Sequence, residues 1–81
     1  MQFIYQRRYS TQFKRYDKKD QERIRNAVLN LPDGDVVRLQ GKQTTPPSDR
    51  LRIGKYRILF RMDAHIIYLD VLDSRGDVYK E

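Results

Sequence analysis

Five basic side chains stand at short intervals in the segment DRLRIGKYRILFRM, residues 49–62. They are Arg50, Arg52, Lys55, Arg57 and Arg61. Strands favour β-branched and aromatic residues, so strand formation alone does not explain this spacing. Guanidinium groups bind phosphate through paired hydrogen bonds, and a tyrosine ring stacks on an unpaired base. With Arg75 and Tyr79, these residues suit a phosphate-binding site, although a solvated sheet face with snorkelling arginines would look the same.

Other kinds of catalytic site find little support. The single histidine, His65, has only Asp63 near it in sequence, so no set of metal ligands is expected. One histidine and no cysteine also leave Ser-His or Cys-His nucleophilic catalysis poorly supported. The four glycines are isolated from one another, which argues against a glycine-rich phosphate loop. We therefore expect neither a metal nor a cofactor.

Length and charge limit the class of protein. The 81 residues suit a single domain, residues 1–81, and six tyrosines with three phenylalanines favour a folded chain. The formal net charge of +6 predicts attraction to RNA, DNA, an anionic membrane or an acidic protein, and charge alone does not choose among them. The sequence shows no signal-peptide pattern and no membrane-length apolar run, so we expect a cytoplasmic protein.

The first elements of the sequence are a strand and a short helix. Residues 2–7 have the apolar and aromatic content of a strand. Ser10 or Thr11 then offers an N-cap oxygen for a short helix. That helix would contain Phe13 and Tyr16.

A second helix is marked more clearly, with a cap at Asp17 and a stop at Pro32. Its apolar residues recur at helical spacing and predict a core stripe of Ile24, Ala27, Val28 and Leu31. After it we expect a turn at 32–35, a short extended piece at 36–41 and a surface loop at 42–49. Two prolines exclude that loop from a central strand.

From residue 50 the pattern alternates with period two, which is typical of strands. One set of side chains is apolar and consists of Tyr56, Ile58, Phe60 and Met62, and the other consists of Lys55, Arg57, Leu59 and Arg61. The segment HIIYLDVLD supplies a partner strand, with one face formed by Ile67, Leu69 and Val71. One face of this hairpin is therefore apolar and suited to cover helices, and the other is basic.

The hairpin register follows from parity, because residues opposite one another share a face of the sheet. The predicted pairs are Phe60 with Leu69, Ile58 with Val71, Arg61 with Tyr68 and Leu59 with Asp70. Residues 63–66 remain as a four-residue loop. The order of elements predicts an α+β fold, β-α-α-β-β-β, in which a small, mostly antiparallel sheet carries two N-terminal helices on one face.

Residues 51–80, LRIGKYRILFRMDAHIIYLDVLDSRGDVYK, resemble the C-terminal half of the RelE/ParE superfamily of toxins from toxin-antitoxin pairs. In that family a basic residue, an apolar residue, Gly, any residue and Tyr-Arg lead into a strand, and the chain closes on Arg, a spacer and Val-Tyr or Ile-Tyr. The matching residues are Arg52, Gly54, Tyr56, Arg57, Arg75, Asp77, Val78 and Tyr79. The helical first half and LQGK, residues 39–42, agree in order and length, so the resemblance covers nearly the whole chain.

The resemblance implies a toxin that enters the ribosomal decoding site and cuts messenger RNA without metal. A ribose 2′-hydroxyl attacks the neighbouring phosphate. Arg57 would stabilise the charge that develops there, with Arg52 and Arg75 helping to hold the phosphate, and Tyr79 would stack on or orient a nucleotide. The further substrate-binding candidates are Arg50, Lys55 and Arg61. The general acid and base stay open between Tyr79 and Lys55.

The resemblance also implies partners and leaves two alternative functions. A cognate antitoxin would cover the sheet and helices with an acidic or amphipathic segment, and the pair would contact promoter DNA mainly through the antitoxin. Ribosome and mRNA are the expected targets, and no membrane partner is expected. ParE-like members instead poison DNA gyrase and generally lack the basic cluster, so this cluster favours the nuclease. An inactive member that only binds its antitoxin or RNA is the third interpretation.

Overall fold

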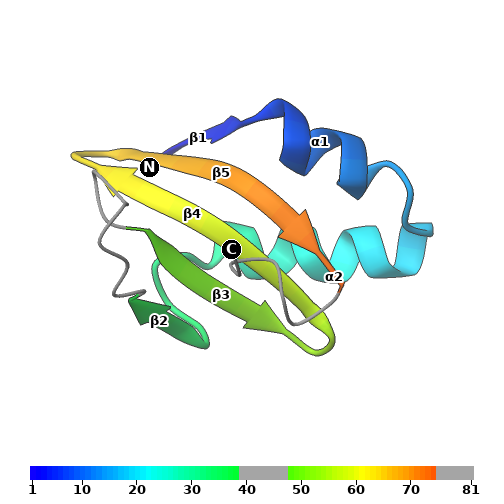
Figure 1. Cartoon of the computed structure of the whole chain (residues 1–81). Coiled ribbons are helices and arrows are strands. Elements are labelled where there is room, and N and C mark those ends of the chain that lie inside the picture. The colour runs from blue at the N-terminus through cyan, green and yellow to red at the C-terminus, as the bar shows by residue number, and fades with distance from the viewer. Residues whose placement is uncertain (39–47, 75–81) are drawn as a thin grey trace.

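The computed structural model describes residues 1–38 and 48–74. Its elements are β1 (Gln2–Tyr5), α1 (Arg7–Phe13), α2 (Lys18–Leu29), β2 (Val36–Arg38), β3 (Asp49–Ile53), β4 (Tyr56–Asp63) and β5 (Ile66–Asp73) (Figure 1). The strands form one sheet in the order β1-β5-β4-β3-β2. The predicted α+β class is confirmed, although four strands rather than three follow the helices.

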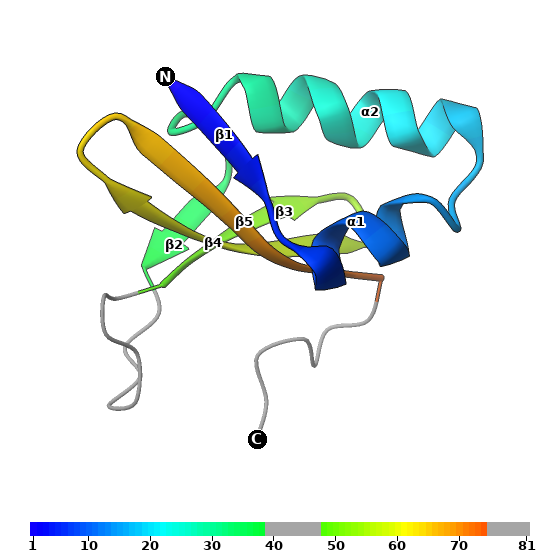
Figure 2. The same cartoon turned by 90° about the horizontal axis from the view of Figure 1, so that it is seen from above.

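The sheet is antiparallel except at one edge, where β1 runs parallel to β5. The first strand reaches this position because a long connection through α1 and α2 separates it from its partner, as parallel pairing requires. α2 runs across one face of the sheet, and α1 packs beside β5 just after β1 ends (Figure 2). The opposite face carries no helix from the described part of the chain.

α1 begins earlier than predicted, at Arg7, and its N-cap is Gln6 without a side-chain hydrogen bond. The Gln6 amide still donates to the Leu69 carbonyl at 3.0 Å, so the chain passes directly from the sheet into the helix. The predicted caps Ser10 and Thr11 therefore lie inside α1, and Tyr16 lies beyond its end.

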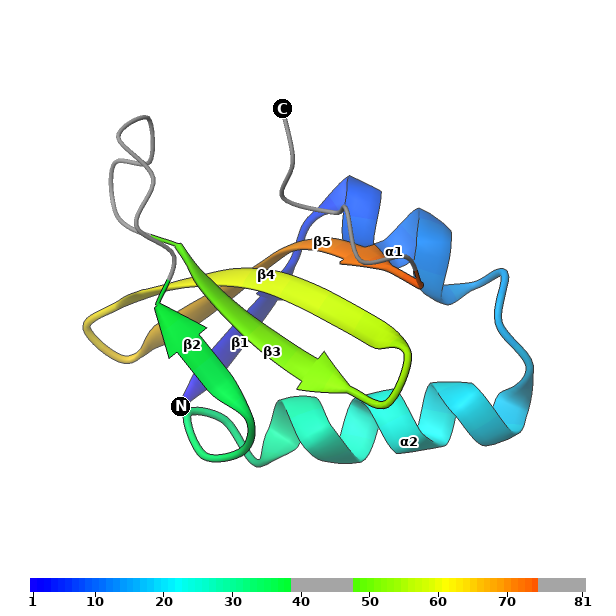
Figure 3. The same cartoon turned by 60° about the horizontal axis from the view of Figure 1, so that its bottom comes forward.

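α2 begins as predicted, because the Asp17 carboxylate accepts a hydrogen bond from the Asp20 amide at 2.9 Å. The helix ends at Leu29, before Pro32. Its stripe is confirmed for Ile24 and Val28, which are buried, and Ala27, which is partly buried; Leu31 is also buried but lies just beyond the end of the helix. These side chains pack against the apolar face of the sheet. Figure 3 shows α2 running below the strands.

The core lies between this face and the helices. The strands contribute fully buried side chains at Leu51, Ile58, Phe60, Ile67 and Leu69. α1 adds Tyr9, which is buried, and Phe13, which is partly buried. β3 starts at Asp49, which was predicted as loop, because its buried carboxylate is held by Arg38 on β2 at 3.1 Å.

The predicted pairing of β4 with β5 is correct in its first part and wrong in its second. Phe60 lies opposite Leu69 and Arg61 opposite Tyr68, as expected. A β-bulge then inserts Asp70 as an unpaired residue, so the remaining pairs are Leu59 with Val71, Ile58 with Leu72 and Arg57 with Asp73. Leu72 therefore replaces Val71 in the core.

The two hairpin turns are tight. β4 and β5 pair as far as Asp63 and Ile66, so the predicted four-residue loop has only two unpaired residues, Ala64 and His65. β3 and β4 are joined by Gly54 and Lys55. Gly54 has φ +58, in the left-handed region that favours glycine, and a Cβ there would lie 3.0 Å from the end of the flexible Arg23 side chain.

Candidate nucleic-acid interface

A row of charged residues crosses the sheet face that α2 does not cover. Arg52 on β3 lies opposite Arg57 on β4, and Arg57 lies opposite Asp73 on β5. The row faces away from the core, because the residues adjacent to it in sequence are buried, namely Leu51, Ile58 and Leu72. Like charges directly opposite each other destabilise a sheet, so folding does not explain the Arg52–Arg57 pair.

Arg57 is half-buried, and its Nε atom is fully shielded from solvent. Within residues 1–38 and 48–74, no group accepts a hydrogen bond from this Nε. A buried donor without an acceptor is costly, and a phosphate oxygen is a strong acceptor for a guanidinium group. The shielded Nε is closed to an external anion as well as to water, so an anion over the sheet would meet the other nitrogens of the half-buried Arg57 guanidinium group.

The Arg52 side chain forms an ion pair with Asp35. Its Nε donates to the Asp35 carboxylate at 2.9 Å, and both side chains are about half exposed, at 50% and 47%. An ion pair this exposed stabilises a protein by about 0 to 1 kcal/mol, so a phosphate can compete with Asp35 for the guanidinium. Arg50, two residues earlier on the same strand and face, is half-buried opposite Leu59.

Arg61 shares the basic face, but its guanidinium has internal partners. It donates to both oxygens of Asp70, at 2.6 and 2.9 Å, and stacks on the Tyr68 ring at 4.7 Å. The bond to Asp70 raises the pKa of Arg61 further above its ordinary value. This geometry favours a role in fixing the bulge rather than in binding substrate.

Lys55 lies apart from the row. It occupies the β3–β4 turn, and its ammonium lies 5.4 Å from the centre of the Tyr56 ring, which belongs to the core. The sequence pattern grouped Lys55 with Arg57, but Lys55 lies in the turn, where side chains no longer alternate between the two faces of the sheet. The structure therefore brings Arg50, Arg52 and Arg57 together and leaves Lys55 at the edge.

Two of the predicted catalytic residues, Arg75 and Tyr79, lie outside the described residues, as does the LQGK segment at 39–42. Sequence reasoning missed a groove of about 340 Å³ at the end of the charged row. We call it the α1–β5 groove, and its lining is formed by Arg7, Arg8, Thr11, Gln12, Val71, Leu72 and Asp73. The sequence signal is the pair Arg7 and Arg8, of which Arg7 ends the predicted first strand and Arg8 follows it.

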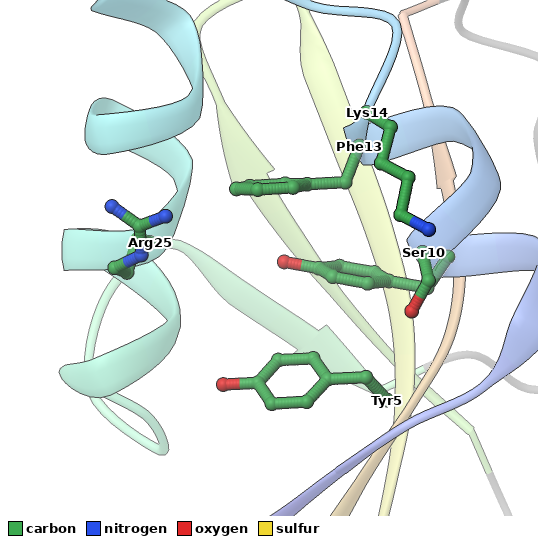
Figure 4. A pocket seen from close by; sticks show the side chains of 6 residues that line it. Tyr5, Ser10, Phe13, Lys14 and Arg25 are labelled. Atoms are coloured by element: carbon green, nitrogen blue, oxygen red, sulfur yellow. The ribbon is translucent and has the colours of Figure 1, made fainter. Parts of the chain in front are cut away.

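The helix side carries a second hollow, of about 320 Å³, between α1 and α2. The rings of Tyr5, Tyr9 and Phe13 form a ladder there, with centroids 5.5 and 5.9 Å apart (Figure 4). Arg25 reaches from α2 toward the Phe13 ring at 5.7 Å, and Lys14 lies at the rim. We call this hollow the helix pocket. It combines an apolar floor with positive charge.

Two further properties concern the part of the chain described here. Among these residues, no three His, Asp or Glu side chains come together in a way that could hold a metal ion. None of the helices is long and apolar enough to cross a membrane.

Comparison with solved structures identifies the architecture. No protein-family model matches the sequence, and no curated protein sequence matches it. The structure is similar to RelE in the crystal structure of an archaeal RelE-RelB complex from Pyrococcus horikoshii OT3, with a TM-score of 0.71 over 93% of this chain and 94% of that chain. The chain has the RelE fold. Sequence identity is 20%, so the similarity is one of fold.

Proposed function

We propose that this protein is a RelE-like toxin of a toxin-antitoxin pair that cuts mRNA on the ribosome without metal. The observation that supports this most strongly is the pair of half-buried Arg57 and exposed Arg52, which lie opposite each other on the open sheet face. Two opposed arginines do not stabilise a sheet, whereas together they can bind a phosphate placed over it.

The proposed reaction is a transfer of the phosphodiester within the RNA. The ribose 2′-oxygen forms a new bond to phosphorus as its proton passes to a general base, and the bond from phosphorus to the 5′-oxygen breaks as that oxygen receives a proton. The products are a 2′,3′-cyclic phosphate and a 5′-hydroxyl. Arg57 would hydrogen-bond the non-bridging oxygens, whose charge grows in the transition state, and Arg52 would leave Asp35 to join it. Tyr79 and Arg75 would complete this arrangement.

Charge preorganisation alone makes a weak ribonuclease, and the ribosome would supply the alignment of the 2′-oxygen with the scissile bond. The protein would then contribute a shape and a set of fixed cations. Arginine suits this role because its charge persists at every ordinary pH. The same property makes Arg50, Arg52 and Arg57 unsuited to proton transfer, which leaves Tyr79 and Lys55 as candidates.

The proposed inhibitor is an antitoxin, as RelB is the partner named with RelE in the similar structure. The helix pocket suits an amphipathic acidic segment, because its three rings can take an apolar side chain while Lys14 and Arg25 attract carboxylates. An antitoxin bound there and across the sheet would keep RNA from Arg57.

The test is cleavage mapping in a purified translation system. We expect messages cut at defined codon positions by the natural protein, and a loss of about 10² to 10³ in rate for Arg57→Gln. Arg15→Gln removes an equal charge from the exposed connection between α1 and α2 and should cut normally. Intact messages with inhibited DNA supercoiling would replace this proposal with the gyrase interpretation.

A further inference from the structure

The charged row continues beyond the sheet. β1 pairs with β5 only as far as Tyr5 and Leu69, so the last residues of β5 have no strand on that side. α1 takes the place of a strand there, next to the arrowhead of β5 (Figure 1). The α1–β5 groove lies between them, and its floor includes Asp73, the residue opposite Arg57.

The groove opens on the same side as the row. Val71 and Asp73 alternate with buried Leu72, so they share the face of Arg57. Adjacent strands lie about 4.8 Å apart, so the β5 side of the groove lies about one strand spacing from Arg57, and Arg7 and Arg8 on α1 lie farther away.

The lining has the chemistry of a nucleotide site. Arg7 and Arg8 are exposed and supply two guanidinium groups, and Thr11 adds an exposed hydroxyl. The Gln12 amide donates to the Tyr16 hydroxyl at 3.3 Å, so it is held in place. A volume of about 340 Å³ is within the range of small-molecule sites.

We propose that the α1–β5 groove is a second RNA subsite, which holds the phosphate next to the one bound at Arg57. This inference rests on the proposed function and adds Arg7 and Arg8 as positioning residues. RNA would cross the sheet along the charged row and leave over α1. Asp73, whose carboxylate accepts the Ser74 amide at 2.7 Å, lies between the two phosphates and weakens both contacts.

The experiment uses the full chain and a fluorescent 2′-O-methyl oligouridine, which cannot be cleaved. Binding is followed by anisotropy over a range of salt concentrations, because each phosphate contact to a single strand contributes about 0.7 to the slope of log K against log salt. The double variant R7Q/R8Q should lower that slope by about 0.7, because the groove holds one phosphate. The matched control K18Q/K19Q removes two exposed lysines from the start of α2 and should leave the slope unchanged.

Asp73→Asn provides a test of opposite sign, since removing the carboxylate should tighten binding. A slope for R7Q/R8Q equal to that of K18Q/K19Q would overturn the inference. So would a loss of binding to a polyglutamate peptide in R7Q/R8Q with RNA unaffected, because the groove would then belong to an acidic protein segment.

Arg57→Gln separates the two proposals. If it weakens RNA binding and R7Q/R8Q does not, the groove inference alone fails. If R7Q/R8Q weakens binding and Arg57→Gln does not, the groove binds RNA and the proposed catalytic role of the row fails.

Discussion

Arg52 and Arg57 lie directly opposite each other on β3 and β4, with both side chains on the face that α2 leaves open. Cross-strand pairs contribute to sheet stability according to their chemistry, and two like charges are an unfavourable pair. Asp35 offsets part of this repulsion through its bond to Arg52, and Asp73, which lies opposite Arg57, offsets a further part.

The first prediction concerns this repulsion. In a double-mutant cycle of Arg52→Thr and Arg57→Thr, the coupling free energy should be unfavourable by about 0.2 to 1 kcal/mol, because the two like charges repel; the cycle leaves out the attraction of Asp73 for Arg57. Urea unfolding at neutral pH measures the four proteins. Arg57→Thr should lose RNA binding, as expected where stability and function conflict. A favourable coupling would show that the two arginines do not repel each other in the folded protein.

The bulge leads to the second prediction. Arg61 binds Asp70 through two hydrogen bonds and is about one-quarter exposed, so we expect a coupling free energy near 1 kcal/mol, the upper part of the range for exposed pairs. A double-mutant cycle of Arg61→Gln and Asp70→Asn isolates it. RNA binding should change far less in Arg61→Gln than in Arg57→Gln. Equal losses would assign Arg61 to the RNA site.

The third prediction is a loss of stability at high pH. The Tyr56 hydroxyl donates to Asp20, and this bond together with burial raises the pKa of Tyr56 to about 12, while burial raises the pKa of Tyr9. The folded state therefore holds these protons more tightly than the unfolded state. Their stabilisation is complete below a pH of about 10, the unfolded pKa of tyrosine, and is lost as pH rises through the folded values.

Unfolding by urea from pH 8 to 11.5 checks this sign. The free energy of unfolding should fall above about pH 10, and the fall should be shallower in Tyr56→Phe. Comparison of the two proteins removes the contribution of lysine titration, which they share. Parallel curves would show that Tyr56 does not hold its proton more tightly when folded.

The helix pocket gives the fourth prediction. Lys14→Glu with Arg25→Glu reverses its charge without altering the row on the other face, so affinity for the cognate antitoxin should fall by at least 10-fold, about 1.4 kcal/mol. Calorimetry with the purified antitoxin measures this, and cleavage by the free toxin should stay unchanged. An unaltered affinity would place the antitoxin elsewhere.

Much of the fold could be predicted from local signals. The Asp17 cap and the spacing of Ile24, Val28 and Leu31 fixed α2, and alternation from residue 50 assigned the arginines to the face opposite the core. These signals work because a helix or strand shows its buried face through its own period. The parallel place of β1 depends instead on contacts with β5, far away in sequence.

The errors in the β4–β5 hairpin share one cause, which is that period two does not reveal where a strand shifts or ends. Val71 and Leu72 are both apolar, so the sequence did not show that Asp70 is a bulge and that Leu72 is the core residue. Because the bulge was not visible in the sequence, the binding of Arg61 to Asp70 was not predicted either. Arg7 lines the α1–β5 groove only because α1 packs against β5 beyond the end of β1.

The most direct test of the central claim is a titration followed by the arginine Nε–H signals in NMR. On addition of the uncleavable oligouridine, we predict large shifts for Arg57 and Arg52 and almost none for Arg61, which Asp70 holds. If the Arg57 signal stays unchanged while RNA is bound, the open face of the sheet is not the phosphate site.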